Sequence, residues 1–174
     1  MQLSNVIDRA VPALPVGAAV LQVLTLGLER ETFALETEMV REVLDRVPIS
    51  EVPNARPFVR GLINVRGKVV PVVDLKRKFG MGATEATTDS RVIVLEIELK
   101  GQPVLIGLLA DRVYEVVELP AAALETAPTL GMRWRAEFIR AIGKRGEDFI
   151  IVLDIERVFA SEESPLHRPQ GKIE

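Results

Sequence analysis

Residues 60–80 read RGLINVRGKVVPVVDLKRKFG, and this stretch constrains the fold more than any other. Gly61 and the tripeptide Arg66-Gly67-Lys68 stand where a chain bends sharply or takes a positive φ, so a tight turn is expected between two apolar runs. Residues 69–75 contain four valines and Leu75, an apolar run interrupted only by Pro71 and Asp74, which predicts a strand buried on both faces or at a barrel closure. Pro71 must then lie at an edge, at a bulge, or where no backbone N–H is needed.

A similar pattern recurs toward the C-terminal end. Arg66 and Asp74 recur as Arg145 and Asp154, in matching local sequences whose spacing differs by one inserted residue. Upstream, the pattern of residues 40–43 recurs at 113–116. The chain therefore contains two copies of one small β unit. Two copies favour a pair of small barrels, because a solenoid needs at least three repeats.

The first copy carries a family signature. Asn64-Val-Arg66-Gly67, followed by Pro71-Val-Val-Asp74-Leu75, resembles the motif of the CheW family, the coupling proteins of bacterial chemosensory arrays. The same fold forms the regulatory domain of the CheA histidine kinase. The resemblance runs from about residue 20 to residue 159. It implies a mainly β fold with two SH3-like five-stranded β-barrels in a pseudo-twofold arrangement, short helices at connections and at the C-terminus, no catalysis and no cofactor.

The resemblance also implies two partners, the regulatory domain of a CheA-type histidine kinase and the cytoplasmic tip of a chemoreceptor. The residues expected to bind them all belong to the first copy: Val40, Glu42, Arg60, Gly61, Asn64 and Arg66. A guanidinium beside an apolar strand suits fork-like pairing with a partner carboxylate or carbonyl. Two alternatives stay open. Arg66 could instead clamp Glu42 or Asp74 within the chain, and Val40 could be ordinary core.

The repeat suggests a simple division of the chain. We expect a flexible N-terminal tail at 1–18, a first barrel at 19–82, a second barrel with a terminal helix at 83–160, and a C-terminal tail at 161–174, together one CheW-like domain. Residues 80–90 are small, polar and glycine-bearing, so they are expected to link the two copies.

Local patterns predict the individual elements. Strands are expected at 20–26, 32–36, 69–75, 91–98, 104–110, 113–119 and 149–154. A short helical turn is expected at 58–63 and a terminal helix at 155–160. The apolar spacing at 38–46 fits either one helical turn or a short strand. Asp74 and Asp154 each end a strand before a helix-compatible segment, which favours a capping role for both over a catalytic pair of carboxylates.

Composition excludes several classes of function. A formal net charge of −3 argues against nucleic acid as a partner, because duplex binding needs a basic face. The absence of cysteine rules out disulfides and thiolate zinc sites and fits a reducing cytoplasm. The apolar stretch 10–28 is broken by Pro12, Pro15 and Gly17, so no direct membrane insertion is expected. We expect a cytoplasmic protein that meets membranes only through receptor arrays.

Catalysis has few candidates in this chain. The single histidine, His167, lies between prolines in the expected C-terminal tail, where nothing would hold it beside a nucleophile. The leading hypothesis is therefore a non-catalytic adaptor that couples chemoreceptors to a kinase. The alternatives are the same scaffold in a non-flagellar pathway (type IV pili or a second-messenger output), a generic SH3-like peptide-binding module, and an enzyme of unknown type.

Overall fold

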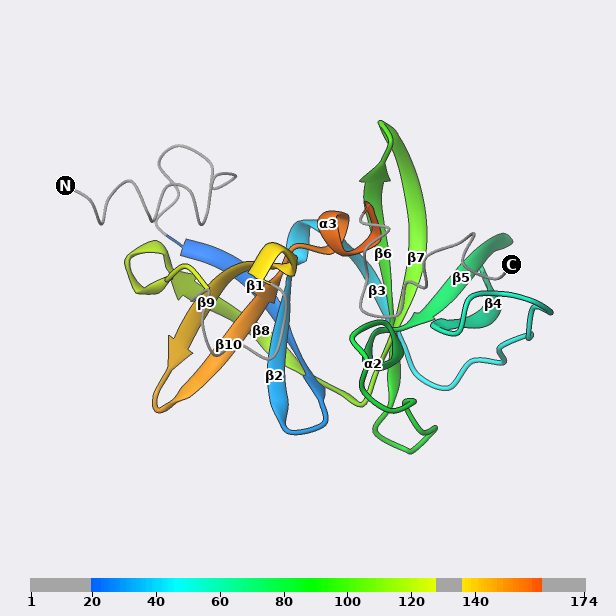
Figure 1. Cartoon of the computed structure of the whole chain (residues 1–174), viewed down its shortest axis with the longest axis horizontal. Coiled ribbons are helices and arrows are strands. Elements are labelled where there is room, and N and C mark those ends of the chain that lie inside the picture. The colour runs from blue at the N-terminus through cyan, green and yellow to red at the C-terminus, as the bar shows by residue number, and fades with distance from the viewer. Residues whose placement is uncertain (1–19, 128–135, 161–174) are drawn as a thin grey trace, which may run out of the picture.

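The computed structural model describes residues 20–127 and 136–160. The chain is mainly β with short helices at the connections (Figure 1). The elements in chain order are β1 (Val20–Leu28), β2 (Glu31–Glu36), η1 (Thr37–Met39), β3 (Val40–Leu44), β4 (Val59–Val65), β5 (Lys68–Asp74), α2 (Leu75–Lys78), β6 (Arg91–Leu99), β7 (Gln102–Ala110), β8 (Arg112–Pro120), η2 (Ala121–Ala123), η3 (Ala136–Phe138), β9 (Ile139–Arg145), β10 (Asp148–Leu153) and α3 (Ile155–Ala160).

The strands form two five-stranded sheets. The first, barrel A, has the order β8-β1-β2-β10-β9, and the second, barrel B, has the order β3-β6-β7-β5-β4. In each sheet an isolated β-bridge connects the two edges. In barrel B it joins Ser50, which follows edge strand β3, to Leu62 on edge strand β4. In barrel A it joins Glu125, which follows edge strand β8, to Ile142 on edge strand β9. The predicted fold class, two SH3-like barrels related by a pseudo-twofold arrangement, is confirmed.

The barrels do not follow the expected division between residues 82 and 83. Barrel A joins the β1–β2 hairpin of the first copy to β8, β9 and β10 of the second, and barrel B combines β3–β5 with the β6–β7 hairpin. The connections explain this exchange. Asp111 alone separates β7 from β8, and a single residue cannot form a hairpin loop, so β8 must enter the other sheet. The expected tails at 1–18 and 161–174 lie outside the described residues.

The strand registers preserve the internal repeat. In barrel A, β2 pairs parallel with β10, with Ala34 opposite Val152. In barrel B, β7 pairs parallel with β5, with Gly107 opposite Val72. These pairs occupy equivalent places in the two copies, so each barrel is assembled from both copies in the same way.

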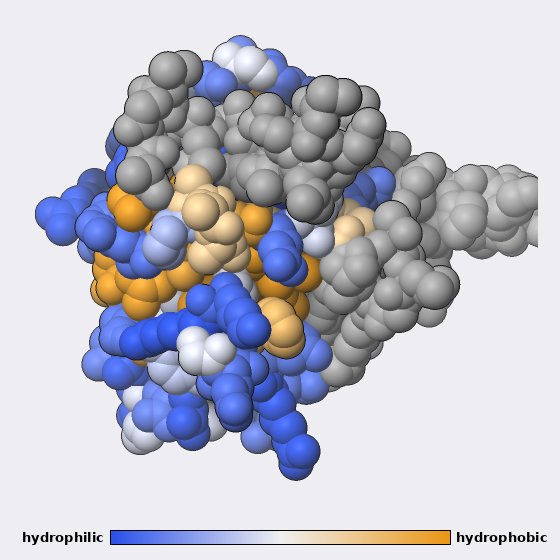
Figure 2. Space-filling model, turned by 90° about the vertical axis from the view of Figure 1, so that its left-hand side faces the viewer, coloured by the Kyte–Doolittle hydropathy of each residue, from blue (hydrophilic) through white to orange (hydrophobic). Residues whose placement is uncertain are grey.

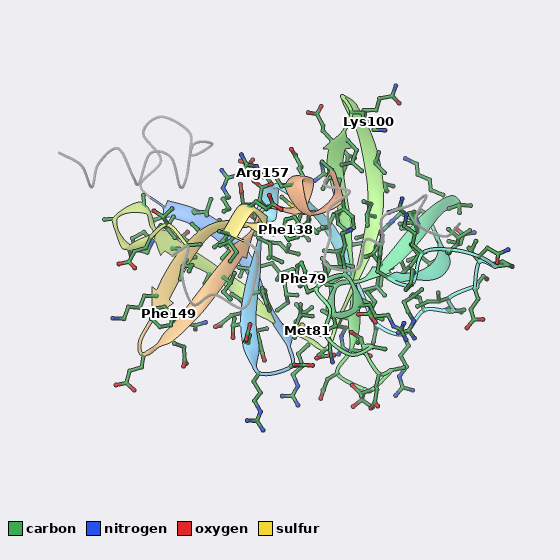
Figure 3. All side chains as sticks on the ribbon, in the orientation of Figure 1. Phe79, Met81, Lys100, Phe138, Phe149 and Arg157 are labelled. Atoms are coloured by element: carbon green, nitrogen blue, oxygen red, sulfur yellow. The ribbon has the colours of Figure 1, made fainter. Side chains whose placement is uncertain are left out.

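One hydrophobic cluster, the shared core, spans the two barrels, and each barrel also has a smaller buried cluster of its own. Phe79, which follows α2 in barrel B, lies 6.0 Å from the Phe33 ring of β2 and 6.5 Å from the Phe138 ring of η3, measured between centroids. Phe79 and Phe138 meet between the barrels in Figure 3. The same buried cluster contains residues of β1 and β2 as well as of β6 and β7. Within the described residues, no helix is long and apolar enough to cross a membrane.

Several expectations about single elements are settled by the fold. The helical turn expected at 58–63 is wrong, because this segment begins strand β4. The open segment 38–46 forms the end of η1 and then β3. The strand expected at 69–75 is buried from Val70 to Asp74, apart from half-buried Pro71, whereas Val69 is 71% exposed. Pro71 precedes the ladder with β7, which starts at Val72. The terminal helix appears as predicted.

Candidate partner-binding surface

The β4–β5 turn of barrel B has a geometry that its residues explain. Arg66 has a φ of 51° and Gly67 a φ of 85°, so both lie in the left-handed region. Glycine adopts this region without steric cost, whereas an arginine there is uncommon. The Oδ1 atom of Asn64 accepts a hydrogen bond of 2.8 Å from the Gly67 N–H. Asn64 and Gly67 together hold a turn that carries Arg66 at its tip.

Arg66 has an ion-pair partner within the chain yet remains accessible. Its Nε lies 3.2 Å from the Oε2 atom of Glu42 on β3, so the alternative of an internal clamp to Glu42 is what the structure forms, whereas Asp74 pairs with Arg60 instead. The Arg66 side chain is nevertheless 83% exposed and that of Glu42 is 27% exposed. A solvent-exposed ion pair contributes at most about 1 kcal/mol to stability. Glu42 therefore orients the guanidinium without burying it.

Gly61 shapes barrel B and presents no side chain to a partner. Its φ of 147° lies at a bulge between β4 and β5. A Cβ added at this position would lie 2.2 Å from the carbonyl oxygen of Ser50. Ser50 and Leu62 exchange two backbone hydrogen bonds of 2.9 and 2.8 Å across this point. The missing side chain thus permits the contact that links the two edges of barrel B.

Arg60 points inward to a buried carboxylate. Its guanidinium lies 3.3 Å from Asp74, which is fully buried, and donates a 2.9 Å hydrogen bond to the carbonyl of Thr84. Asp74 also accepts from the N–H of Lys76, so the predicted helix cap is confirmed. Thr84 belongs to the expected link at 80–90, which is tied down here and not merely a spacer.

The structure brings together only part of the predicted set. Glu42, Asn64 and Arg66 gather at one end of barrel B, and we call these three residues the turn surface. Arg60 lies near the start of β4 and Arg66 just beyond its end, a separation of about 20 Å along a strand. Val40 is half-buried and packs against the shared core, as the core alternative predicted.

The second copy repeats the central ion pair, which the sequence reasoning missed as a candidate site. Arg145 of the β9–β10 turn lies 2.7 Å from Glu115 on β8, and both side chains are about half exposed. Arg145 and Glu115 are the repeat counterparts of Arg66 and Glu42, so the repeat spacing was sufficient to find this pair. Gly143 stands where the first copy has Asn64, so the second turn lacks the amide cap.

Barrel A also exposes apolar side chains. Tyr114, Val116 and Phe149 are 51%, 52% and 59% exposed. Phe149 follows the second turn as Val69 follows the first. Figure 2 shows the barrel A end of the molecule, where apolar surface gathers beside hydrophilic residues. Exposed aromatic and aliphatic groups next to charges are typical of protein-binding surfaces.

Two titratable groups near the junction of the barrels are perturbed by burial. Lys78 is 3% exposed, and its ammonium lies 4.1 Å from the centre of the Phe58 ring and 5.4 Å from that of Phe159. Burial, aided by the charge of Arg56, lowers the pKa of Lys78 from 10.5 to about 8. Burial raises the pKa of Glu36, although the nearby Arg140 opposes this shift.

A cavity of about 440 Å³ lies between the barrels beside α3. Its lining is mostly acidic: Glu36, Glu38, Glu96, Asp154 and Glu156, with Arg140, Met39, Leu153 and Ile155. This part of the junction is therefore polar. Even so, no group of three His, Cys, Asp or Glu side chains in the described part of the chain is arranged to hold a metal ion.

The fold defines a class of protein: two five-stranded β-barrels joined through a common hydrophobic cluster, with charged and polar groups exposed at the β4–β5 turn. The chain belongs to the family of CheW-like domains, whose family model matches residues 22–163. The chain is 31% identical to the chemotaxis protein CheW of Klebsiella aerogenes over 144 residues, 83% of each protein. The crystal structure of the scaffolding protein TtCheW from Thermoanaerobacter tengcongensis superposes with a TM-score of 0.72 at 32% identity, covering 82% of this chain and 94% of that one. Protein PilI of Pseudomonas aeruginosa is 31% identical over 81 residues, 47% of this chain and 43% of PilI.

Proposed function

We propose that this chain is a non-catalytic cytoplasmic adaptor that couples chemoreceptors to a CheA-type histidine kinase. Its family membership supports the general role in chemotaxis signalling. The observation that carries the proposal is the turn surface, where a largely exposed arginine at the tip of a tight turn lies beside Glu42. An exposed guanidinium can form two parallel hydrogen bonds to a carboxylate, or one to a carbonyl, of a partner.

The proposed mechanism is architectural. The turn surface pairs with a homologous barrel in the regulatory domain of the kinase, while the receptor tip docks at the junction between the two barrels. Contacts of this kind combine an apolar centre with a charged rim. The adaptor changes no covalent bond. It holds receptor and kinase together, so that a conformational change of the receptor shifts the equilibrium of a two-state kinase.

The proposal is tested by calorimetric titration of the chain into the isolated regulatory domain of the kinase. Arg66→Glu is expected to weaken binding by ~1–3 kcal/mol, roughly 5- to 100-fold in Kd, because it replaces an anchor with the opposite charge and repels Glu42. The turn itself keeps its Asn64 and Gly67 contact, so the fold should be retained.

Arg41→Glu provides a matched control. Arg41 lies on β3 beside Glu42, forms another exposed ion pair, with Glu96, and is outside the turn surface. We expect this variant to bind like the parent chain. If Arg66→Glu binds as tightly as Arg41→Glu while both are folded, the turn surface is not the contact. If the parent chain itself does not bind, the kinase assignment fails.

The output of the pathway is a separate question. The second candidate is the alternative left open by the sequence, the same scaffold in a non-flagellar pathway with type IV pili or a second messenger as its output. Deletion of the protein in its host distinguishes the flagellar from the non-flagellar pathway. Loss of flagellar taxis with normal surface motility favours the flagellar pathway, and loss of surface motility with normal flagellar taxis favours the non-flagellar one.

A further inference from the structure

The chain crosses from barrel B to barrel A at Asp111, and this residue ties the two barrels together. Its carboxylate accepts a 2.7 Å hydrogen bond from the N–H of Glu29, in the β1–β2 turn of barrel A. The same Oδ2 atom lies 3.3 Å from the ammonium of Lys76, in α2 of barrel B. The side chains of Lys76 and Asp111 are 11% and 24% exposed, so solvent screens this ion pair less than a surface pair. We call the Lys76–Asp111 pair the latch.

The internal repeat places a second pair of residues on the opposite side of the junction. It aligns Glu38 of η1 with Asp111, and Glu156 of α3 with Lys76, at the same separations as the segments that flank them. Figure 1 shows the β7–β8 crossing on the lower side of the junction and α3 on the upper side. The two positions that form an ion pair on the lower side are therefore both acidic on the α3 side.

The α3 side of the junction has no latch of its own. Glu38 and Glu156 line the cavity of about 440 Å³, and neither carboxylate forms an ion pair with another described residue. Because they carry the same charge, they repel each other where Lys76 and Asp111 attract. The remaining charged groups of the lining are three carboxylates and one guanidinium: Glu36, Glu96, Asp154 and Arg140.

Two buried groups on the α3 side are also incompletely solvated. The Nε and Nη2 atoms of Arg140 are buried and make no hydrogen bond, although Nε lies 2.8 Å from the carboxylate of Glu36. Burial raises the pKa of Glu36, which means that its charged form is destabilised. Buried donors without acceptors and desolvated carboxylates both become more stable when water reaches them. The arrangement of the barrels seen here is therefore less favourable on the α3 side than on the latch side.

We propose that the two barrels form a hinge, in which the latch holds them together on the Asp111 side and they open on the α3 side by turning about the shared core. Opening separates Glu38 from Glu156 and admits water to Arg140. In the proposed function the receptor tip docks at this junction, so the opening sets the width of the receptor site. The hinge itself is inferred only from contacts and charges within the chain, and its test uses no partner.

Distances between two spin labels, measured by pulsed electron paramagnetic resonance on the full chain, test the hinge. The chain has no cysteine, so each pair of labels is introduced by two substitutions. Glu98→Cys on β6 and Glu118→Cys on β8 are exposed and lie near the strand ends far from the crossing, so their separation reports on opening. Arg30→Cys and Thr88→Cys lie beside segments that contact the crossing and report on the latch side.

Salt is the first variable of the test. In ~1 M salt the Debye length is about 3 Å, so repulsion across the cavity is largely screened. We expect the distance between labels at 98 and 118 to shorten and its distribution to narrow. The distance between labels at 30 and 88 should stay unchanged.

Charge reversal is the second variable. Glu156→Lys should shorten the distance between labels at 98 and 118 even at low salt, because it places an ammonium opposite Glu38 as Lys76 lies opposite Asp111. Glu38→Lys reverses the other member of the pair and should have the same effect, which covers a folding defect in either variant. Glu147→Lys is the matched control, since it makes the same charge change at an exposed position of the β9–β10 turn, outside the cavity lining.

The control should leave both distances unchanged. The hinge is wrong if neither salt nor either charge reversal at the cavity shortens the distance between labels at 98 and 118. It is also wrong if Glu147→Lys shortens this distance as much as Glu156→Lys does. Equal changes in both label pairs would show that the barrels separate uniformly, without a fixed latch side, and would likewise overturn the proposal.

Discussion

Lys78 is a buried cation between two aromatic rings, and its position makes stability depend on pH. Its folded-state pKa of about 8 lies below the value of 10.5 for an unperturbed lysine, because burial disfavours the charged form. Between these values the unfolded chain binds more protons than the folded chain. The free energy of unfolding should therefore rise as pH increases from about 8 toward 10.5, by up to about 3 kcal/mol from this group. Below pH 8 this group adds no further slope.

Lys78→Met isolates this contribution, because methionine keeps an unbranched chain of similar length without the charge. We expect the variant to be more stable than the parent at pH 7 and to lose the advantage as pH rises. Urea denaturation at pH 7 and at pH 10 measures both, and the difference between the two proteins cancels the other groups that titrate in this range. Parallel pH profiles for parent and variant would show that Lys78 is charged in the folded state throughout.

Part of the candidate site was predictable from local sequence. Asn64, Gly67 and the caps Asp74 and Asp154 act on neighbours within a few residues, so their roles follow from spacing. The inward direction of Arg60 was not predictable in this way. It depends on Thr84, far along the chain, whose position is set by the path of the chain after α2.

The pairing of strand β4 with Ser50 depends on a glycine at position 61. Gly61→Ala would drive a Cβ into the carbonyl of Ser50 at 2.2 Å, in a backbone conformation that side chains rarely adopt. We expect it to break the bridge between Ser50 and Leu62 and to lower the free energy of unfolding by ~2–4 kcal/mol. Urea denaturation measures the change.

Gly67→Ala is the control for the conformational part of this cost. Gly67 also has a positive φ, but an added Cβ would meet nothing within 4 Å. We expect a loss of only ~1 kcal/mol, that of placing a side chain in the left-handed region. Equal losses in the two variants would mean that the crowding at Ser50 relaxes without cost.

The error at 58–63 has an element-scale cause. A proline-rich segment precedes it and a glycine-bearing turn follows it, and its apolar spacing does not distinguish one helical turn from an irregular strand. What makes it a strand is the partner on each side, β5 along most of its length and Ser50 at the bulge. Neither partner can be recognised from this short segment itself.

At the scale of the whole molecule, the shared core should make the two barrels unfold together. Phe79→Ala removes the ring of barrel B that packs against Phe33 and Phe138 of barrel A. We expect a loss of ~3–5 kcal/mol, felt equally by both barrels, because one cluster spans them.

Hydrogen exchange of amides in β7 and β10 reports on barrels B and A separately, and both should lose the same protection in Phe79→Ala. Phe149→Ala, at an exposed position of barrel A, should change neither. A loss confined to β7 would indicate that the barrels unfold independently and that the junction contributes little.

Most of the strands, the repeat, the capped helix starts and the tight turns could be recognised in the sequence, because each of these depends on residues close together in the chain. How the two copies combine depends on contacts between distant parts of the chain, which only the fold reveals. Equivalent strands have the same apolar pattern, so β2 could pair with β5 or with β10 on local grounds. Asp111, the single residue between β7 and β8, and η1 (Thr37–Met39), between β2 and β3, lead the chain from one sheet to the other. As a result, the β1–β2 hairpin pairs with strands of the second copy and the β6–β7 hairpin with strands of the first. The shared core around Phe79 follows from that exchange.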